Sequence, residues 1–412
     1  MALGAGLIVS VAGISALMAV RVNRRATLQA GDFTEARLAA QSAIELGMQD
    51  IRSNPAWRQS KPNGVWRSNQ PLGRGLITLE AIDPADGNLA NNPADHLLMT
   101  GIGVVGNGRY KLAVELEPQG PPGMDCLASA VHTSTLLSVN STVAANAPIS
   151  SNASVEVGLT GVVNGDVEAT TAIVNLGTIS GTSTQGVAAK EMPSGSVFDY
   201  YIANAVPIAL SALPLELLIL RREIRNVVLS PGSNPYGGVT HPQGLYLLDC
   251  QGTNIRIENA RIHGTLVILD PGLDSEISGN IFWERYNPQL PALLVRGSIN
   301  FDWSGSLSES GGSGPSTNYN PPGSPYQGVT DADNADTYPS LMKGLVYVSG
   351  VLTNADGTTI DGVVVTAGLA MTVNRPLTVT HDAAIIQNPP PGFQRAFRPM
   401  QTVAGSWRQL VD

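Results

Sequence analysis

"GLVYVSG" at residues 344–350 and "GVVVTAG" at residues 362–368 carry one pattern in a chain of 412 residues. Each places a short, mainly apolar run between two glycines, and the second copy begins 18 residues after the first. Short strands with glycine corners at a constant spacing are typical of a coil of stacked rungs. One rung cannot bury its inner face alone, so the pattern predicts a parallel β-helix whose core comes from stacking.

Similar bursts extend the predicted coil over the second part of the chain. They recur at 254–269 ("NIRIENARIHGTLVIL") and 292–303 ("ALLVRGSINFDW"), and residues 134–184 are rich in Val, Thr, Ser, Asn and Gly with little charge. We therefore predict a right-handed parallel β-helix over residues 123–412, with a β-sandwich as the alternative. Insertions are expected at 185–243, which contains an apolar run, and at 304–340, a long polar loop of the kind that is often functional.

The N-terminal segment is apolar. No charged residue occurs from Ala2 to Val20, and three arginines follow at positions 21, 24 and 25. A helix needs about 20 apolar residues to cross a bilayer, so this run is long enough for a membrane anchor. Its small residues would allow other helices to approach closely.

A second helical pattern follows without a clear break. Small and apolar residues recur at helical spacing from Ala36 to Ile51, and Asn54-Pro55 ends the pattern because the residue before proline disfavours the helical conformation. We expect one helix over residues 1–54, with two separate helices as the alternative. A helix of about 52 residues would be about 78 Å long.

A small α+β region is expected at residues 55–122. The segment "GLITLEAID" (75–83) alternates as a strand does, and residues 96–118 read as a hairpin around Gly106-Asn107-Gly108. Together with the long helix and the coil, this gives an α+β fold class.

The run "ARLAAQSAIELG" (36–47), behind the apolar helix, resembles the N-terminus of type IV pilin-like proteins, especially the minor-pilin (PilX-type) and pseudopilin branch. The resemblance implies a subunit of an extracellular pilus (a fimbrium) that is stored in the inner membrane and polymerises with copies of itself through its helix. The inner-membrane pilus assembly machinery would be a further partner. A leader is removed in that family and the new N-terminal residue is methylated, so a chain beginning at Met1 fits a mature form.

The residues expected to pack in the filament core are Met1, Gly4, Ala5, Gly6, Ala12, Gly13, Ala16 and Ala19. One of them departs from the family pattern, because most major pilins carry glutamate at the fifth mature position, where this chain has Ala5. Tip-type pseudopilins also lack that glutamate. Two structural functions therefore stay open: a main filament subunit, or a minor tip pilin that acts as an adhesin for a surface polysaccharide.

Other functions receive less support from the sequence. A formal net charge of −9, with no basic run after residue 25, does not suit a nucleic-acid partner. Some β-helices are polysaccharide-active enzymes, but the carboxylates of this coil do not fall at a rung-like spacing, so we expect no enzyme.

Two small features remain. The segment "DADNAD" offers Asp331, Asp333 and Asp336 as oxygen ligands for Ca²⁺, although a solvated acidic turn is the alternative and no other cofactor is expected. The two cysteines, Cys126 and Cys250, would form a disulfide in an exported protein or stay as buried thiols.

Overall fold

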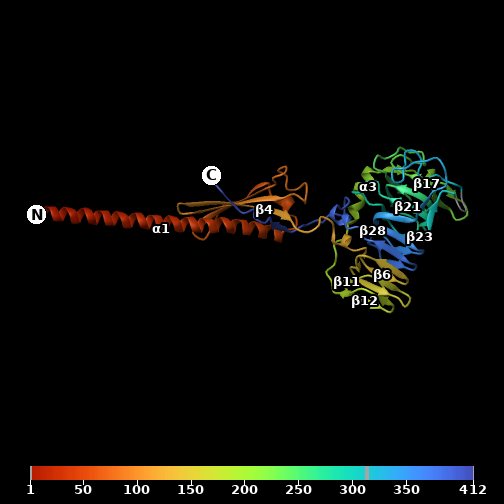
Figure 1. The fold of residues 1–412 in the computed structure, drawn as a ribbon, viewed down its shortest axis with the longest axis horizontal. Helices are drawn as coiled ribbons and strands as arrows, with labels where there is room; N and C mark the ends of the chain where they lie inside the picture. Colours follow the sequence, from red (N-terminus) through yellow and green to blue (C-terminus); the bar gives the residue numbers. More distant parts are fainter. Residues whose placement is uncertain (1, 311–314, 412) are drawn as a thin grey trace. The chain divides into compact units, whose positions relative to one another are not determined.

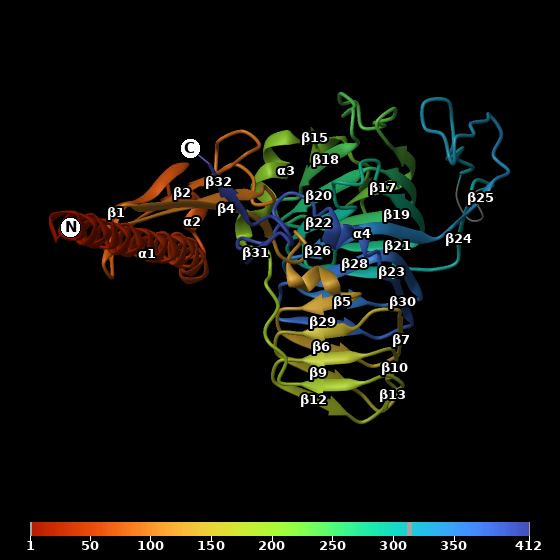
Figure 2. The same cartoon turned by 60° about the vertical axis from the view of Figure 1, so that its left-hand side comes forward.

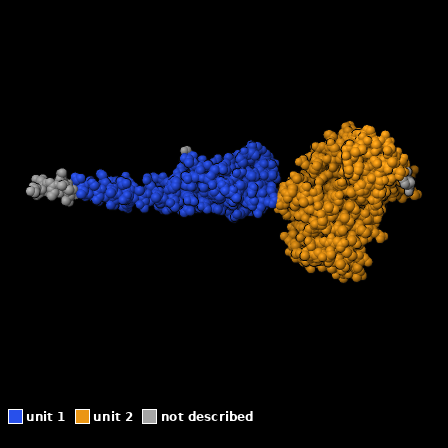
Figure 3. All heavy atoms as spheres, viewed as in Figure 1, with its two compact units in different colours: residues 1–120, 396–412 blue, residues 121–395 orange. Residues whose placement is uncertain are grey.

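A computed structural model describes the backbone of residues 2–310 and 315–411 and, within those ranges, the side chains from residue 11 onward. The chain forms two compact units (Figure 3). Unit 1 contains residues 1–120 and 396–412, and unit 2 contains residues 121–395. A long helix, a small antiparallel sheet and a large parallel coil confirm the predicted α+β class.

Helix α1 (Ala2–Ser53) is a single helix, as expected, and it passes through Gly31 without a break (Figure 1). It ends immediately before Asn54-Pro55, where the chain turns into the short helix α2 (Trp57–Ser60).

The sheet of unit 1 packs on the second half of α1. Its first four strands form an antiparallel meander: β1 (Gly64–Leu72), β2 (Gly75–Ile82), β3 (Leu97–Val105) and β4 (Gly108–Pro118). The predicted strand at 75–83 and the predicted hairpin at 96–118 are confirmed. Strand β1 was not anticipated, and neither were two C-terminal strands that pair with β4: β31 (Met400–Thr402) and β32 (Arg408–Leu410).

Glycines of β3 explain why α1 is rich in alanine between residues 36 and 43. A methyl group on Gly103 would lie 2.1 Å from the carbonyl oxygen of Ala36, and one on Gly101 would lie 2.1 Å from that of Ala40. Helix backbone and strand backbone thus approach as closely as the missing side chains allow. Ala36 and Ala40 are fully buried in this contact.

Unit 2 is a parallel β-helix that encloses a core of Val, Ile, Leu and aromatic side chains (Figure 2). The first group of strands is β5 (Val131–Thr133), β6 (Leu136–Val139), β7 (Thr142–Ala145), β8 (Ile149–Ser151), β9 (Ser154–Val157), β10 (Val162–Asn164), β11 (Val167–Ala169), β12 (Ala172–Asn175), β13 (Thr178–Ile179) and β14 (Ser183–Gln185). The second group is β15 (Val206–Ile208), β16 (Leu215–Glu216), β17 (Arg221–Leu229), β18 (Leu245–Asp249), β19 (Ile255–His263), β20 (Thr265–Leu269), β21 (Glu276–Glu284), β22 (Leu293–Arg296) and β23 (Ile299–Trp303). The last group is β26 (Leu341–Val348), β27 (Leu352–Asn354), β28 (Thr358–Thr366), β29 (Ala370–Val373) and β30 (Leu377–Thr380).

The glycine repeat from which the coil was predicted lies on two adjacent rungs. Strands β26 and β28 pair in parallel with Gly344 beside Gly362 and Val346 beside Val364, so the sequence spacing of 18 is the length of one rung. A methyl group on Gly362 would lie 1.9 Å from the carbonyl oxygen of Gly344. Glycine is therefore required where the two corners stack.

One wall of the coil has apolar side chains on its inner and on its outer surface. Outward residues such as Leu245, Val267 and Val363 form a second cluster with Phe198 and Phe393 from segments that cover this face. Those segments include helix α3 (Asp199–Asn204) and helix α4 (Ala384–Gln387). Burial on both faces explains why runs such as "TLVIL" (265–269) are continuously apolar rather than alternating.

The order of rungs differs from the order of the sequence. Val131 of β5 pairs with Val364 of β28, and the neighbouring strands β6 and β7 pair with β29 and β30. The chain therefore begins its coil in the middle, winds to one end at β12–β14, and starts again at the other end with β15–β17 (Figure 2). Part of the expected insertion at 185–243 is consequently coil, because β15 and β17 pair with β18 and β19.

Two other boundaries differ from the prediction. The coil does not extend to residue 412, because residues 396–412 leave it and complete the sheet of unit 1. The long loop at 304–340 is present, and it contains an antiparallel pair, β24 (Ser306–Ser308) and β25 (Thr337–Pro339).

The predicted disulfide is not formed in the structure, and both thiols are free and buried. Cys126 belongs to the cluster outside the coil, whereas Cys250 belongs to the core inside it, so the coil wall separates their surroundings. Burial raises the pKa of each thiol to about 12, which leaves both as inert apolar groups.

Candidate functional site

The first half of α1 exposes large apolar side chains. Leu17 is 71% exposed, and Val11, Ile14, Met18, Val20, Val22 and Leu28 are each more than half exposed. The second half of the same helix is covered by the sheet, where Ala36, Ala40 and Ile44 are fully buried. An exposed apolar surface on this scale marks an interaction site, since isolated apolar residues are normal on a surface but a continuous stripe is not.

The predicted packing residues Ala12, Ala16 and Ala19 lie along one face of this exposed segment, because residues three and four apart are neighbours on a helix. Ile14, Leu17 and Met18 lie on the other side. A methyl group added to Gly13 would meet no other described atom within 4 Å. The helix thus presents one side with small residues and one with large residues, a shape that copies of itself can fit closely.

The packing roles predicted for Met1, Gly4, Ala5 and Gly6 concern side chains outside the described residues. Among the residues from 11 onward, whose side chains are described, no helix combines the length and the hydropathy required to cross a membrane.

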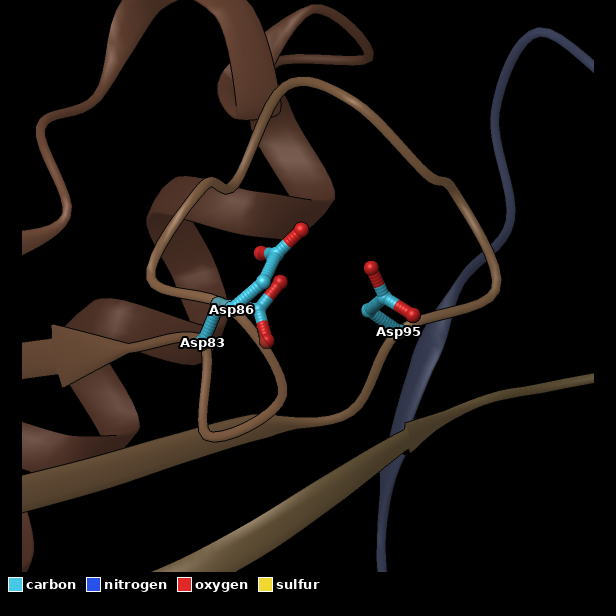
Figure 4. Close-up of side chains that lie close together, drawn as sticks. All are labelled: Asp83, Asp86 and Asp95. Atoms are coloured by element: carbon cyan, nitrogen blue, oxygen red, sulfur yellow. The ribbon is translucent and has the colours of Figure 1, made fainter.

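The loop between β2 and β3 gathers three aspartates, Asp83, Asp86 and Asp95 (Figure 4). One carboxylate oxygen from each lies within 4.8 Å of the others. Asp83 is 4% exposed, and its Oδ2 has no hydrogen-bond partner among the described residues. The sequence pattern does not reveal this cluster, because its members are irregularly spaced within an ordinary polar loop.

A second acidic cluster lies in the long loop of unit 2. Asp331 and Asp333, two of the three predicted calcium ligands, lie with the buried Glu309. The third, Asp336, is outside this group: its Oδ2 accepts a hydrogen bond from Asn320, and its backbone N–H donates to Glu309 Oε2. Asn320 also donates to Asp331. The structure thus brings two predicted residues together with a glutamate 22 positions upstream, and binding of Ca²⁺ there stays a prediction.

A buried histidine belongs to a row of polar side chains that stack on successive rungs of the coil. His132, Ser150 and Glu168 occupy equivalent positions on three successive rungs. The imidazole Nδ1 is 2.7 Å from Ser150 Oγ, and Lys190 donates to Glu168 at 2.7 Å. Burial, and then the charge of Lys190, lower the pKa of His132 to about 3.

This histidine predicts a pH dependence. Because its folded pKa is below the ordinary value of about 6.5, the unfolded chain binds an additional proton between those values, so stability is complete above about pH 6.5 and falls as the pH is lowered. We expect unit 2 to lose up to about 1.4 kcal/mol per pH unit from this group between pH 6 and 5. The measurement is denaturant unfolding of the full chain against pH, and His132→Gln should flatten the dependence. Equal slopes in both proteins would contradict the assignment.

No family model matches the sequence, and no curated protein matches it. The solved structures that are similar to the chain at a low level include the following two. The competence-associated pilin ComZ from Thermus thermophilus has 11% identity and a TM-score of 0.35, with 92% of this chain and 98% of that chain covered. An ice binding protein from an Antarctic Biological Consortium has 14% identity and a TM-score of 0.26, with 64% of this chain and 92% of that chain covered. Both TM-scores are below 0.5, so neither likeness establishes a function for this chain.

Proposed function

We propose that this protein is a structural subunit of an extracellular, type IV pilus-like filament, in which helices α1 of many copies pack together and the coil is displayed outside. The observation that carries the proposal is the division of α1 into a covered half and an exposed half. The covered half already has its partner within unit 1. The exposed half has large apolar side chains and small residues but no partner within the described chain.

The physical reason for polymerisation is the cost of leaving that stripe in water. Burial of a Leu or Ile side chain contributes roughly 1.5–3 kcal/mol, and α1 exposes several such residues on consecutive turns. Copies of the same helix can cover one another's exposed apolar residues, and each added copy brings a new exposed helix to which a further copy can bind. A single folded partner would cover the apolar residues without extending the assembly. The uncharged run from Ala2 to Val20 supports storage of the helix in the inner membrane before assembly.

The variant Gly13→Leu tests the proposal. Position 13 lies one turn from Leu17 and beside Ala16, so a leucine there would force neighbouring helices apart, and overpacking of this kind costs typically 1–3 kcal/mol. We expect the yield of filaments to fall at least about tenfold while the coil stays folded. Filaments sheared from cells would be counted by electron microscopy and their main band identified.

Gly195→Leu is the matched control, because the methyl position at Gly195 is also open but lies in unit 2. Normal filament yield from Gly13→Leu would count against helix packing at that face. The same preparation separates the two structural functions: a main subunit gives long fibres of this chain alone, and a tip adhesin gives a few copies per fibre.

A further inference from the structure

The carboxylates of the three aspartates of the β2–β3 loop approach one another closely. Figure 4 shows Asp83 and Asp86 side by side, with Asp95 across the loop from them. Asp83 Oδ1 accepts a hydrogen bond from the backbone N–H of Ala85 at 2.7 Å, whereas Oδ2 is buried and unpartnered among the described residues. An unpaired carboxylate oxygen in a buried position lowers the stability of the fold, so a ligand bound to this oxygen would be stabilising.

The guanidinium of Arg58, which interacts electrostatically with Asp95 and Asp83, does not supply that ligand. The guanidinium of Arg58 donates to the backbone carbonyl of Asp95 at 2.6 Å and to that of Leu89 at 3.3 Å, rather than to the carboxylates. Its charge offsets at most one of the three aspartates. The cluster therefore keeps an excess of negative charge, and a divalent cation would be favoured there.

The other hydrogen bonds of the cluster leave room for metal coordination. Asp86 accepts from the backbone N–H of Asn88 and from the side chain of Asn91, and Asp95 Oδ1 accepts from the side chain of Asn92 at 2.7 Å. Each carboxylate still has free lone pairs, since an ionised carboxylate offers about four acceptor sites. A direct hydrogen bond between Asp83 and Asp95 would need a proton on one of them, and a cation can occupy the same place.

We propose that Asp83, Asp86 and Asp95 bind one Ca²⁺ ion, with Asp83 Oδ2 as the buried ligand and water completing the shell. Ca²⁺ takes six to eight oxygen ligands in flexible geometry, which suits three carboxylates from an irregular loop. Mg²⁺ is less suitable because it requires near-ideal octahedral geometry and loses its water reluctantly. The bound ion would fix residues 83–95, a loop that contains Leu89 of the apolar cluster around Trp57.

The site does not depend on filament formation, so its test is separate. Tb³⁺, a luminescent substitute for Ca²⁺, would be titrated into the full chain in detergent, with Trp57 as the energy donor and Ca²⁺ as the competitor. The chain would carry D331N and D333N so that the second acidic cluster does not contribute. We expect saturable emission that Ca²⁺ abolishes.

Asp86→Asn and Asp95→Asn should each weaken binding at least about tenfold, because each removes one charged ligand. Glu45→Gln, an exposed carboxylate of α1 in the same unit, is the matched control and should leave the affinity unchanged. Asp86 is exposed, so its variant retains the fold even if substitution of the buried Asp83 does not. Absence of emission, emission that Ca²⁺ does not displace, or undiminished affinity in both Asp86→Asn and Asp95→Asn would overturn the proposal.

Discussion

Gly362→Ala is expected to destabilise the coil by about 3 kcal/mol or more, although it adds a single methyl group. That methyl would lie 1.9 Å from the carbonyl oxygen and 2.6 Å from the carbonyl carbon of Gly344 on the adjacent rung. Backbone atoms in a stacked corner cannot rotate away as a side chain can, so the two rungs must separate. Separation would break the parallel pairing of β26 and β28 near the middle of the coil.

The measurement is denaturant unfolding monitored through Trp283 and Trp303, both of which are buried in the coil. Gly357→Ala is the matched control, because its methyl would meet Ser304 at an ordinary distance of 3.7 Å. We expect the control to change stability by less than about 0.5 kcal/mol. If the two variants are equally stable, stacking of glycine corners does not determine the coil.

Gly103→Ala is expected to loosen helix α1 from its sheet at a cost of about 2–3 kcal/mol. The new methyl would lie 2.1 Å from the carbonyl oxygen of Ala36 and 2.7 Å from the backbone nitrogen of Ala40. Either the helix moves away from β3 or the strand bends, and both changes open the alanine-lined contact. Hydrogen exchange of residues 36–51 followed by mass spectrometry would show the faster exchange that we expect.

Gly31→Ala is expected to have the opposite effect on hydrogen exchange in the same helix. Its methyl position is open, and alanine is the better helix former by roughly 0.5–1 kcal/mol. We therefore expect slower exchange around residue 31. Unchanged exchange of residues 36–51 in Gly103→Ala would show that the close approach contributes little to the stability of unit 1.

Local signals in the sequence predicted the individual elements well. Asn54-Pro55 placed the end of α1, and the spacing from Gly344 to Gly362 gave the length of one rung. Both signals act through backbone conformation or direct stacking, so they can be read from short stretches of residues.

The order of the rungs could not be predicted in this way. Every rung has inward apolar residues at similar spacing, so nothing in "AVHTST" (130–135) indicates that Val131, which pairs with Ile149 on one side, pairs with the distant Val364 on the other. For the same reason the prediction of a coil that continues to residue 412 is wrong, because the short strands of residues 396–412 complete the other sheet.

The acidic clusters show a related limit. Asp331 and Asp333 were visible as alternating carboxylates, but Glu309 joins them only through the fold of the loop. Asp83, Asp86 and Asp95 are close in sequence but follow no ligand spacing, and the burial that leaves Asp83 Oδ2 unpartnered is a property of the folded loop alone. The two cysteines are a further example, because they lie in different buried clusters of unit 2 and their spacing in the sequence does not show this.

The position of the coil between β4 and β31 sets an order in which the chain can fold. Met400 must pair with Pro118, yet about 275 residues lie between the two parts of unit 1. In the folded coil, Gly123 and Gln394 form a bridge, so this long stretch begins and ends at one point. Loop closure costs about 0.6 kcal/mol for each doubling of length, and a folded coil therefore saves about 3 kcal/mol for the last strands of unit 1. During synthesis the helix and the meander can form first, and the sheet is completed only after the coil has closed.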